Sequence, residues 1–253
     1  MYFDTHAHYD DKAFTTDRYD LLTRIFKETD VSLILNPGCD RKSSDMAVSL
    51  SENYPGMYAA VGWHPHDAKS FDDRSSDYIL QTAAKKKVVA IGEIGLDYHY
   101  DFSPREVQKD VFRMQLALAA ELNMPVIVHD REAHGDTLDI VREFPGLRGV
   151  FHCYSGSPEM AMEILQLGWY LSFTGVITFK NARKTLETIE IAPMDKIMLE
   201  TDCPYLSPIP FRSERNDSSY LPYIAAAVSK VKNISPSRIA EITLENGRHF
   251  FGI

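Results

Sequence analysis

The chain has 253 residues, 44% of them apolar and 25% charged, a composition typical of globular proteins that excludes a disordered or low-complexity chain. Its 36 acidic and 27 basic side chains give a net charge of −9, which argues against a protein that holds long nucleic acid in a basic groove. Three widely spaced cysteines and the absence of any apolar run of about 18 residues exclude a disulfide scaffold and a membrane-spanning helix.

Eight short apolar runs, rich in β-branched and aromatic residues, predict strands that are buried on both faces. In chain order they are Met1–Phe3, Val31–Leu35, Tyr58–Val61, Val88–Ile91, Val126–Val128, Gly149–Phe151, Tyr170–Phe173 and Ile197–Leu199. Amphipathic stretches between the runs predict helices, most clearly Pro104–Leu122, Gly135–Phe144, Pro158–Leu167 and Asn181–Ile191. Eight alternating strand–helix units predict a (β/α)8 TIM barrel that spans residues 1–253 as a single domain. An open doubly wound sheet is the alternative, although the glycine-rich phosphate motifs typical of that fold are missing.

The end of the chain predicts one long loop followed by two helices. The polar, turn-rich segment Ser207–Ser219 follows the eighth strand and should lie on the catalytic face of the barrel. In the last helix Ser235 is a suitable N-cap and Pro236 suits the first helical position. Gly247 is a candidate interruption of that helix.

Residues typical of metal sites follow five of the eight strands, where the catalytic groups of a TIM barrel project. They are His6 and His8, Glu93, His129, His152 and Asp202. His6 and His8 lie two residues apart on a strand, so both imidazoles point to one face and can meet one ion. A single histidine at a strand end is usually a satisfied polar residue. The coincidence of four histidines and two carboxylates at one rim therefore predicts a divalent-metal site.

Six sequence motifs, in order along the whole chain, resemble those of the TatD family of metal-dependent deoxyribonucleases, within the amidohydrolase-like hydrolases. They are FDTHAH, GWHPH, GEIGLDYHYD, PVIVHDREA, FHCYSG and LETDCPYLSP. The resemblance implies a centre of two divalent ions bridged by Glu93. The other ligands that it implies are His6, His8 and Asp202 for the first ion, and His129 and His152 for the second.

The same resemblance implies hydrolysis of DNA phosphodiester bonds by a metal-activated water, in the 3′-to-5′ direction from an end. Glu93 and Asp202 are then the catalytic residues, with Asp202 placed to accept or steer the proton of the water. Mixed histidine and carboxylate ligands suit Mn²⁺, Zn²⁺ or Fe²⁺ better than Mg²⁺, but all four ions stay open. The resemblance also allows hydrolysis of another ester or amide, such as D-aminoacyl-tRNA, a lactone or a cyclic amide. The missing bridging lysine argues against the cyclic amide.

Four further residues are candidates for binding the substrate. Arg131 should face the same way as His129 and either grips phosphate or forms an ion pair at the rim. Arg212 and Arg215, in the last loop, either contact nucleic acid or hold the loop in place. His64 either contacts phosphate, together with His66, or orients a metal ligand.

Three more side chains adjoin proposed ligands in the sequence. Glu200 should point the same way as Asp202 and support the ligands, whereas Cys153 and Cys203 should face away from the metals because alternate strand residues face opposite sides.

The expected substrates are DNA ends, short oligonucleotides or a small phosphodiester. Two bound ions would place four positive charges where phosphate sits, so the net charge excludes only a broad grip on long duplex. We expect no membrane association and no obligate protein partner. Because the first residues lack a signal-peptide pattern, we expect a cytoplasmic protein, and a monomer is expected for a barrel of this size.

Overall fold

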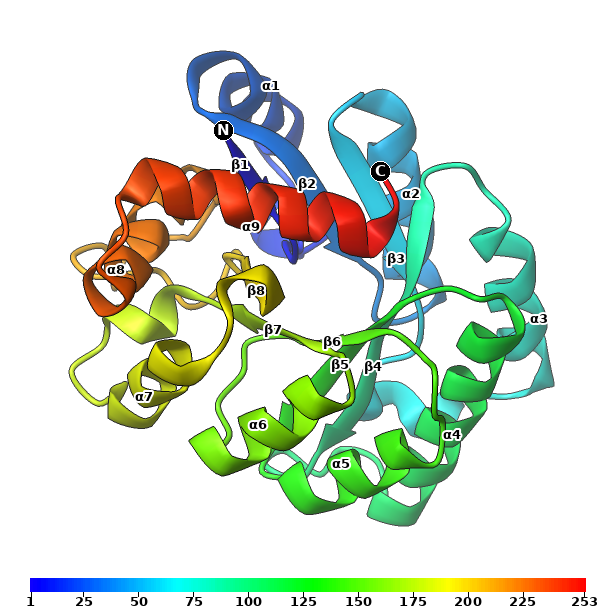
Figure 1. Cartoon of the computed structure of the whole chain (residues 1–253). Helices are drawn as coiled ribbons and strands as arrows, with labels where there is room; N and C mark the ends of the chain where they lie inside the picture. The colour runs from blue at the N-terminus through cyan, green and yellow to red at the C-terminus, as the bar shows by residue number, and fades with distance from the viewer.

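Eight parallel strands pair in chain order, from the first to the eighth, and curve into a barrel (Figure 1). The structure is a computed structural model that describes all 253 residues. The strands are β1 (Tyr2–Asp4), β2 (Val31–Pro37), β3 (Met57–Val61), β4 (Val88–Asp97), β5 (Val126–Arg131), β6 (Gly149–Phe151), β7 (Tyr170–Phe173) and β8 (Ile197–Leu199). This order confirms the predicted TIM barrel, and the doubly wound alternative is wrong.

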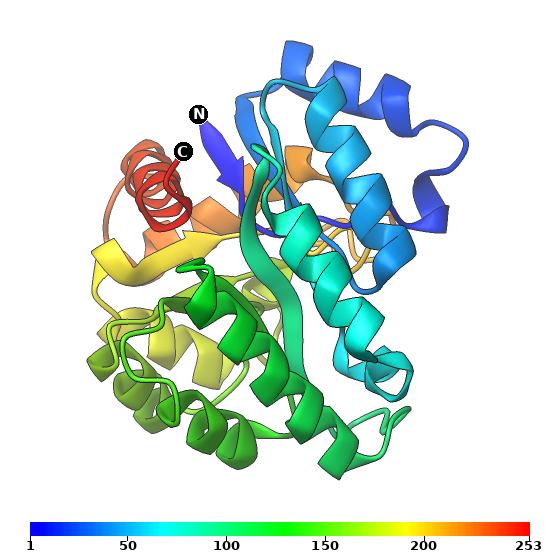
Figure 2. The same ribbon diagram turned by 90° about the vertical axis from the view of Figure 1, so that its right-hand side faces the viewer.

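Helices surround the strands on the outside of the barrel, as the amphipathic stretches predicted (Figure 2). They are α1 (Arg18–Glu28), α2 (Arg41–Asn53), α3 (Asp73–Ala83), α4 (Arg105–Glu121), α5 (His134–Arg142), α6 (Pro158–Gln166), α7 (Arg183–Ile191), α8 (Leu221–Lys232) and α9 (Pro236–Phe251). The four helices predicted most clearly correspond to α4, α5, α6 and α7, with ends within two residues. None of the nine helices is both long and apolar enough to cross a membrane.

Strand β4 is longer than the sequence predicts, and this changes where Glu93 lies. The expected strand ended at Ile91, but pairing with β5 resumes at Ile94 after an irregularity in the register and continues to Asp97. A local pattern cannot reveal pairing that resumes beyond such an irregularity. Glu93 therefore lies inside the barrel, in the middle of a strand, and Asp97 takes the strand's end.

Helix α9 covers one end of the barrel and packs on β1 and β8 (Figure 1). Its Phe250 and Phe251 join a buried cluster with Phe3, which fills the barrel at the end opposite the polar strand ends. Gly247 does not interrupt the helix. A Cβ atom there would lie 2.5 Å from the Phe3 ring, so the glycine permits the close approach of α9 to β1.

The barrel closes between β8 and β1 through backbone bonds beside the strand ends. The amide of Thr5 donates to the carbonyl of Leu199 (3.2 Å), and the amide of Asp202 donates to the carbonyl of His6 (2.9 Å). A buried carboxylate, Asp4, reinforces this seam. It accepts hydrogen bonds from the amide and hydroxyl of Thr201 (2.9 and 2.6 Å) and from the hydroxyl of Ser218 (2.6 Å).

We expect Asp4→Ala to lower the free energy of unfolding by about 2–3 kcal/mol, because it leaves buried donors at the seam without an acceptor. Asp4→Asn should cost less, since its amide oxygen still accepts from the Thr201 amide. Urea unfolding of all three proteins with a chelator present, so that metal binding does not contribute, measures both changes. Equal unfolding midpoints for wild type and Asp4→Ala would contradict this role of the seam.

Candidate metal centre

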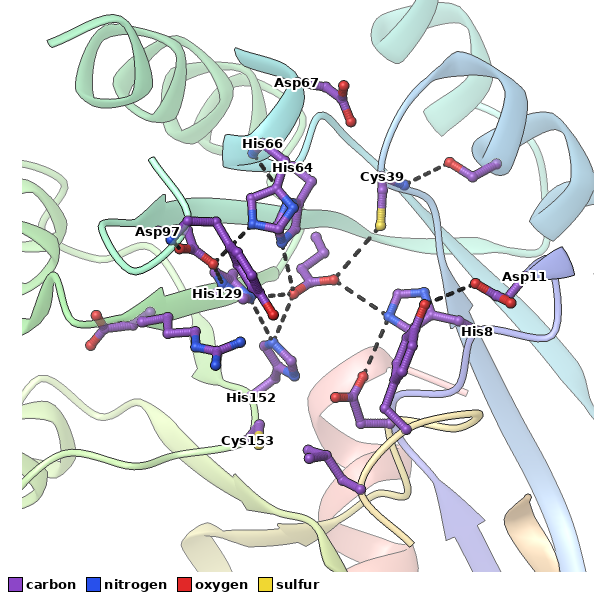
Figure 3. Close-up of a pocket in the computed structure, with 18 of the residues that line it drawn as sticks. His8, Asp11, Cys39, His64, His66, Asp67, Asp97, His129, His152 and Cys153 are labelled. Carbon is purple, nitrogen blue, oxygen red and sulfur yellow. Dashed lines mark hydrogen bonds and ion pairs between the residues drawn. The ribbon is translucent and has the colours of Figure 1, made fainter. Parts of the chain in front are cut away.

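A cavity of about 980 Å³ opens at the carboxyl ends of the strands. Most of the histidines and carboxylates singled out from the sequence line it: His8, Glu93, His129, His152 and Asp202. His6 lies just beneath, fully buried, with its ring stacked on that of His152 at a centroid distance of 4.0 Å. The structure thus brings all six predicted ligands together around one point, and Figure 3 shows three of them, His8, His129 and His152, at the cavity.

Glu93 lies at the centre, and its two carboxylate oxygens face two different groups of side chains. Oε2 faces the β1 side, where His6 Nε2 and His8 Nε2 lie at 3.4 and 3.5 Å. Asp202 Oδ1 completes this group at 3.4 Å from His8 Nε2. Oε1 faces the other side, where His129 Nδ1 and His152 Nε2 lie at 2.7 and 2.8 Å. One carboxylate therefore reaches both groups.

Carboxylates also lie on the far sides of the His129 and His152 rings, away from Glu93. Nε2 of His129 bonds Asp97 Oδ2 at 3.1 Å, which orients the ring with Nδ1 toward Glu93. Nδ1 of His152 lies 3.4 Å from Glu200 Oε1 without forming a hydrogen bond, and its Nε2 faces Glu93. This contact agrees with the expectation that Glu200 supports the predicted metal ligands. Nδ1 of His129 and Nε2 of His152 thus converge on one carboxylate oxygen, with 3.3 Å between the two nitrogens.

This set of donor atoms fits divalent metal ions. Where the imidazoles are neutral, their lone pairs and the carboxylate oxygens repel one another in a buried site unless a metal ion lies between them. Two groups that share Glu93 have three possible ligand atoms within 4.8 Å of one another. They are His6, His8 and Glu93, and His64, Glu93 and His129. Imidazole nitrogens and carboxylates are ligands for zinc, manganese and iron.

The carboxyl groups of Glu93 and Asp202 are both ionised, and the ionised form is the one that binds metal ions. Burial acts to raise the pKa of Glu93, but electrostatic interactions with the surrounding histidines, His152 first, outweigh it and hold the pKa well below the ordinary value. Burial also acts to raise the pKa of Asp202. Its hydrogen bond with His8 and the charges of the other histidines reverse the effect, so this pKa too lies below its ordinary value.

His64 differs from the other histidines because its Nδ1 accepts a hydrogen bond from the amide of His66 (3.2 Å). Burial holds the pKa of His64 well below its ordinary value, so the ring is neutral. Its one proton must then lie on Nε2, which is 3.6 Å from Glu93 Oε1. In this form His64 can donate a hydrogen bond from Nε2 into the cavity.

The three arginines predicted to bind substrate lie in different surroundings. Arg131 lines the cavity, and its guanidinium lies over the Tyr100 ring at 4.8 Å without a carboxylate partner. The other two lie away from the cavity wall. Arg212 packs over a phenylalanine ring, and Arg215 forms two hydrogen bonds with the carboxylate of Asp17 (2.9 and 2.6 Å). The geometry of Arg215 favours the alternative in which it holds the loop in place.

Comparison with known proteins agrees with this geometry. A sequence model of the family described as TatD related DNase matches residues 3–252. The chain belongs to this family. It is 44% identical over 255 residues to an uncharacterised metal-dependent hydrolase, YabD of Bacillus subtilis (strain 168), with both chains covered completely. It is 34% identical over 262 residues to a 3′-5′ ssDNA/RNA exonuclease TatD of Escherichia fergusonii, with 99% of each chain covered.

A solved structure is similar over the same length. The crystal structure of YjjV, a TatD homolog from Escherichia coli K12, superposes with a TM-score of 0.92 at 31% identity. The superposition covers 100% of this chain and 98% of that chain. The resemblance to the TatD family, drawn from six motifs, is therefore confirmed.

The structure corrects one expectation about the cysteines of this TatD family member. Cys153 was expected to face away from the metals, but it lines the cavity. Strand β6 ends at Phe151 and Cys153 adopts a left-handed backbone conformation (φ 44°), so strand alternation no longer applies to it. Cys203 is buried and lies outside the cavity lining, as expected.

Two residues of the centre were missed in the sequence. Cys39, just after β2, places its Sγ 3.8 Å from Glu93 Oε2, and burial raises the pKa of the thiol to about 12. Cys39 follows the second predicted strand, so the same search for metal-binding side chains at strand ends would have found it. Asp97 bonds both His129 and His66, the latter at 3.0 Å, and was missed because β4 was expected to end earlier.

We expect Asp97→Asn to weaken divalent-metal binding about 10–100-fold, because His129 loses the carboxylate that fixes its ring and raises its basicity. Competition with a fluorescent chelator measures the affinity. Asp130→Asn is the matched control, since Asp130 also lines the cavity but bonds His134 and Thr137 instead of a predicted ligand. Equal metal affinities for the two variants would show that Asp97 does not support the centre.

Proposed function

We propose that the chain is a divalent-metal-dependent phosphodiesterase that removes nucleotides from the 3′ end of single-stranded DNA. The observation that carries the proposal is the position of Glu93, whose two oxygens face separate groups of ligand atoms. This arrangement suits two ions bridged by one carboxylate, the geometry used for phosphoester hydrolysis. Family membership and the exonuclease name of a relative at 34% identity support the reaction and its direction.

We assign the first ion to His6, His8 and Asp202 and the second to His129 and His152, with Glu93 shared. When bound, two such ions lower the pKa of a water and offset the charge that develops on the phosphoryl oxygens. The residues of the chain orient the participants. Asp202 is ionised and lines the cavity, so it can accept the proton of the attacking water.

The phosphate is held by groups on the wall beside the second ion. His64, with its proton on Nε2, donates to a phosphoryl oxygen, and Arg131 supplies a cation without a carboxylate partner. Arg212 and Arg215 have no part in this step, because neither lines the cavity. A monomeric state, the lack of an obligate partner and a cytoplasmic location stay predictions from the sequence.

Purified protein with single-stranded DNA labelled at the 5′ end tests the reaction. We expect a ladder of progressively shorter labelled products in Mg²⁺ or Mn²⁺. RNA, D-aminoacyl-tRNA, lactones and cyclic amides are assayed in parallel. Hydrolysis of one of the last three without any shortening of DNA or RNA would replace the proposed reaction with the alternative.

Asp202→Asn should lower kcat on DNA by roughly 10²–10⁴-fold, because the amide cannot accept the proton. Glu93→Gln should abolish measurable hydrolysis because it removes the shared charged ligand. Circular dichroism checks that both variants fold. Asp67→Asn, which neutralises another carboxylate of the cavity, is the matched control and should keep near-normal activity. Full activity in either of the first two variants would refute the assigned site.

Protein purified without chelators should contain two divalent ions per chain by elemental analysis, and Glu93→Gln should contain fewer. After removal of metal by a chelator, we expect Mn²⁺ or Zn²⁺ to restore activity at lower concentration than Mg²⁺, because four ligands are imidazoles. A content of one ion in fully active protein would contradict the two-ion assignment.

A further inference from the structure

Two aromatic side chains at the cavity are exposed although their rings are large and apolar. Tyr100 is 46% exposed and Phe102 is 57% exposed, and both line the cavity. Their rings are stacked, with centroids 5.2 Å apart and planes at 27°. Both rings also contact the edge of His66, with centroid distances of 5.2 and 4.9 Å. We call Tyr100 and Phe102 the aromatic platform.

The backbone that carries the platform is fixed at both ends. Asp97 Oδ1 accepts a hydrogen bond from the amide of Tyr100 (2.8 Å). After Phe102, the buried hydroxyl of Ser103 donates to the carbonyl of His66 (2.9 Å) and accepts from the amide of Lys69 (3.1 Å). The two rings therefore stay exposed because the backbone around them holds them there. A prearranged apolar surface of this kind binds with little loss of conformational entropy.

The platform lies beside the wall to which we assign the scissile phosphate. Asp97 connects them directly, since the carboxylate that accepts from the Tyr100 amide also bonds the ring of His129. Figure 3 shows Asp97, His66 and His129 together on one side of the site. The guanidinium of Arg131 lies over the Tyr100 ring at 4.8 Å. An aromatic face next to a phosphate-binding cation is the combination that holds single-stranded nucleic acid.

We propose that the aromatic platform is a nucleobase subsite, on which a base near the 3′ end stacks while its phosphate lies at Arg131 and the metal centre. This inference rests on the proposed function and names how the same site selects its substrate. Stacking on an aromatic ring accepts every base, so the subsite is not sequence-specific. A base that is paired and stacked in a duplex cannot reach it, so the subsite selects single-stranded or frayed ends.

The test compares the affinity of two fluorescent oligonucleotides, of which one lacks bases. One is an ordinary single strand, and the other carries stable abasic residues at its last two 3′ positions. Anisotropy is measured in Mn²⁺ with Asp202→Asn in every protein, so that the DNA stays intact. With the platform intact, we expect the ordinary strand to bind about tenfold more tightly, the factor that one base–aromatic stack typically contributes.

Variants of the platform separate stacking from simple apolar contact. Tyr100→Ala/Phe102→Ala and Phe102→Leu should lose most of the preference for the ordinary strand, whereas Phe102→Trp should keep or increase it. Tyr19→Ala is the control, because Tyr19 is 51% exposed and does not line the cavity. Equal affinity for both strands with the platform intact would overturn the subsite, as would a preference that survives in the double variant.

The proposed function is judged separately, by turnover of the ordinary strand with native Asp202. Turnover without a preference for bases refutes the subsite alone. A base preference without turnover of DNA or RNA refutes the nuclease activity and leaves a base-binding surface beside a metal centre of other specificity.

Discussion

The structure depends on one electrostatic constraint, which is the burial of an ionised carboxylate inside the barrel. Glu93 is only 3% exposed, and a charge in such a place is costly unless other charges compensate for it. The compensation comes from a histidine on β5, from histidines that follow β1 and β6, and from the metal ions that they suit. Each side chain reaches Glu93 only if its strand keeps its register. The metal centre can therefore assemble only when the strands of the sheet pair in the correct order and register.

Two departures from a regular barrel serve this requirement. The irregular pairing of β4 at Glu93 places the carboxylate in the barrel interior and moves the strand's end to Asp97, which then supports His129. The seam between β8 and β1 has no regular ladder, and the amide of Asp202 instead donates to the carbonyl of His6. This bond sets a carboxylate from one end of the sheet beside histidines from the other.

The sequence predicted the barrel and the gathering of histidines and carboxylates at its rim because both follow from local rules. Strands that are buried on both faces are apolar throughout, and the polar residues that end them all face one rim. The rest depends on contacts between distant residues. The position of Asp97 could not be predicted because the pairing of β4 resumes only after an irregularity in the register. The role of Gly247 could not be predicted because it depends on the close approach of Phe3. The role of Arg215 is set by Asp17, which lies far away in the sequence and shows no local sign of the ion pair.

The cavity, like the chain as a whole, carries more acidic than basic side chains. Eight carboxylates line the cavity against a single arginine, Arg131, and no lysine. In that field a phosphodiester is repelled until cations occupy the centre, and each divalent ion reverses part of the local potential. Under the proposed function, metal binding therefore precedes substrate binding, and the attraction stays confined to the few ångströms around the ions. Beyond that distance the protein offers phosphate little, so the affinity for the rest of a short strand must come from uncharged contacts. Exposed, prearranged aromatic rings are the side chains that supply such contacts to a nucleobase.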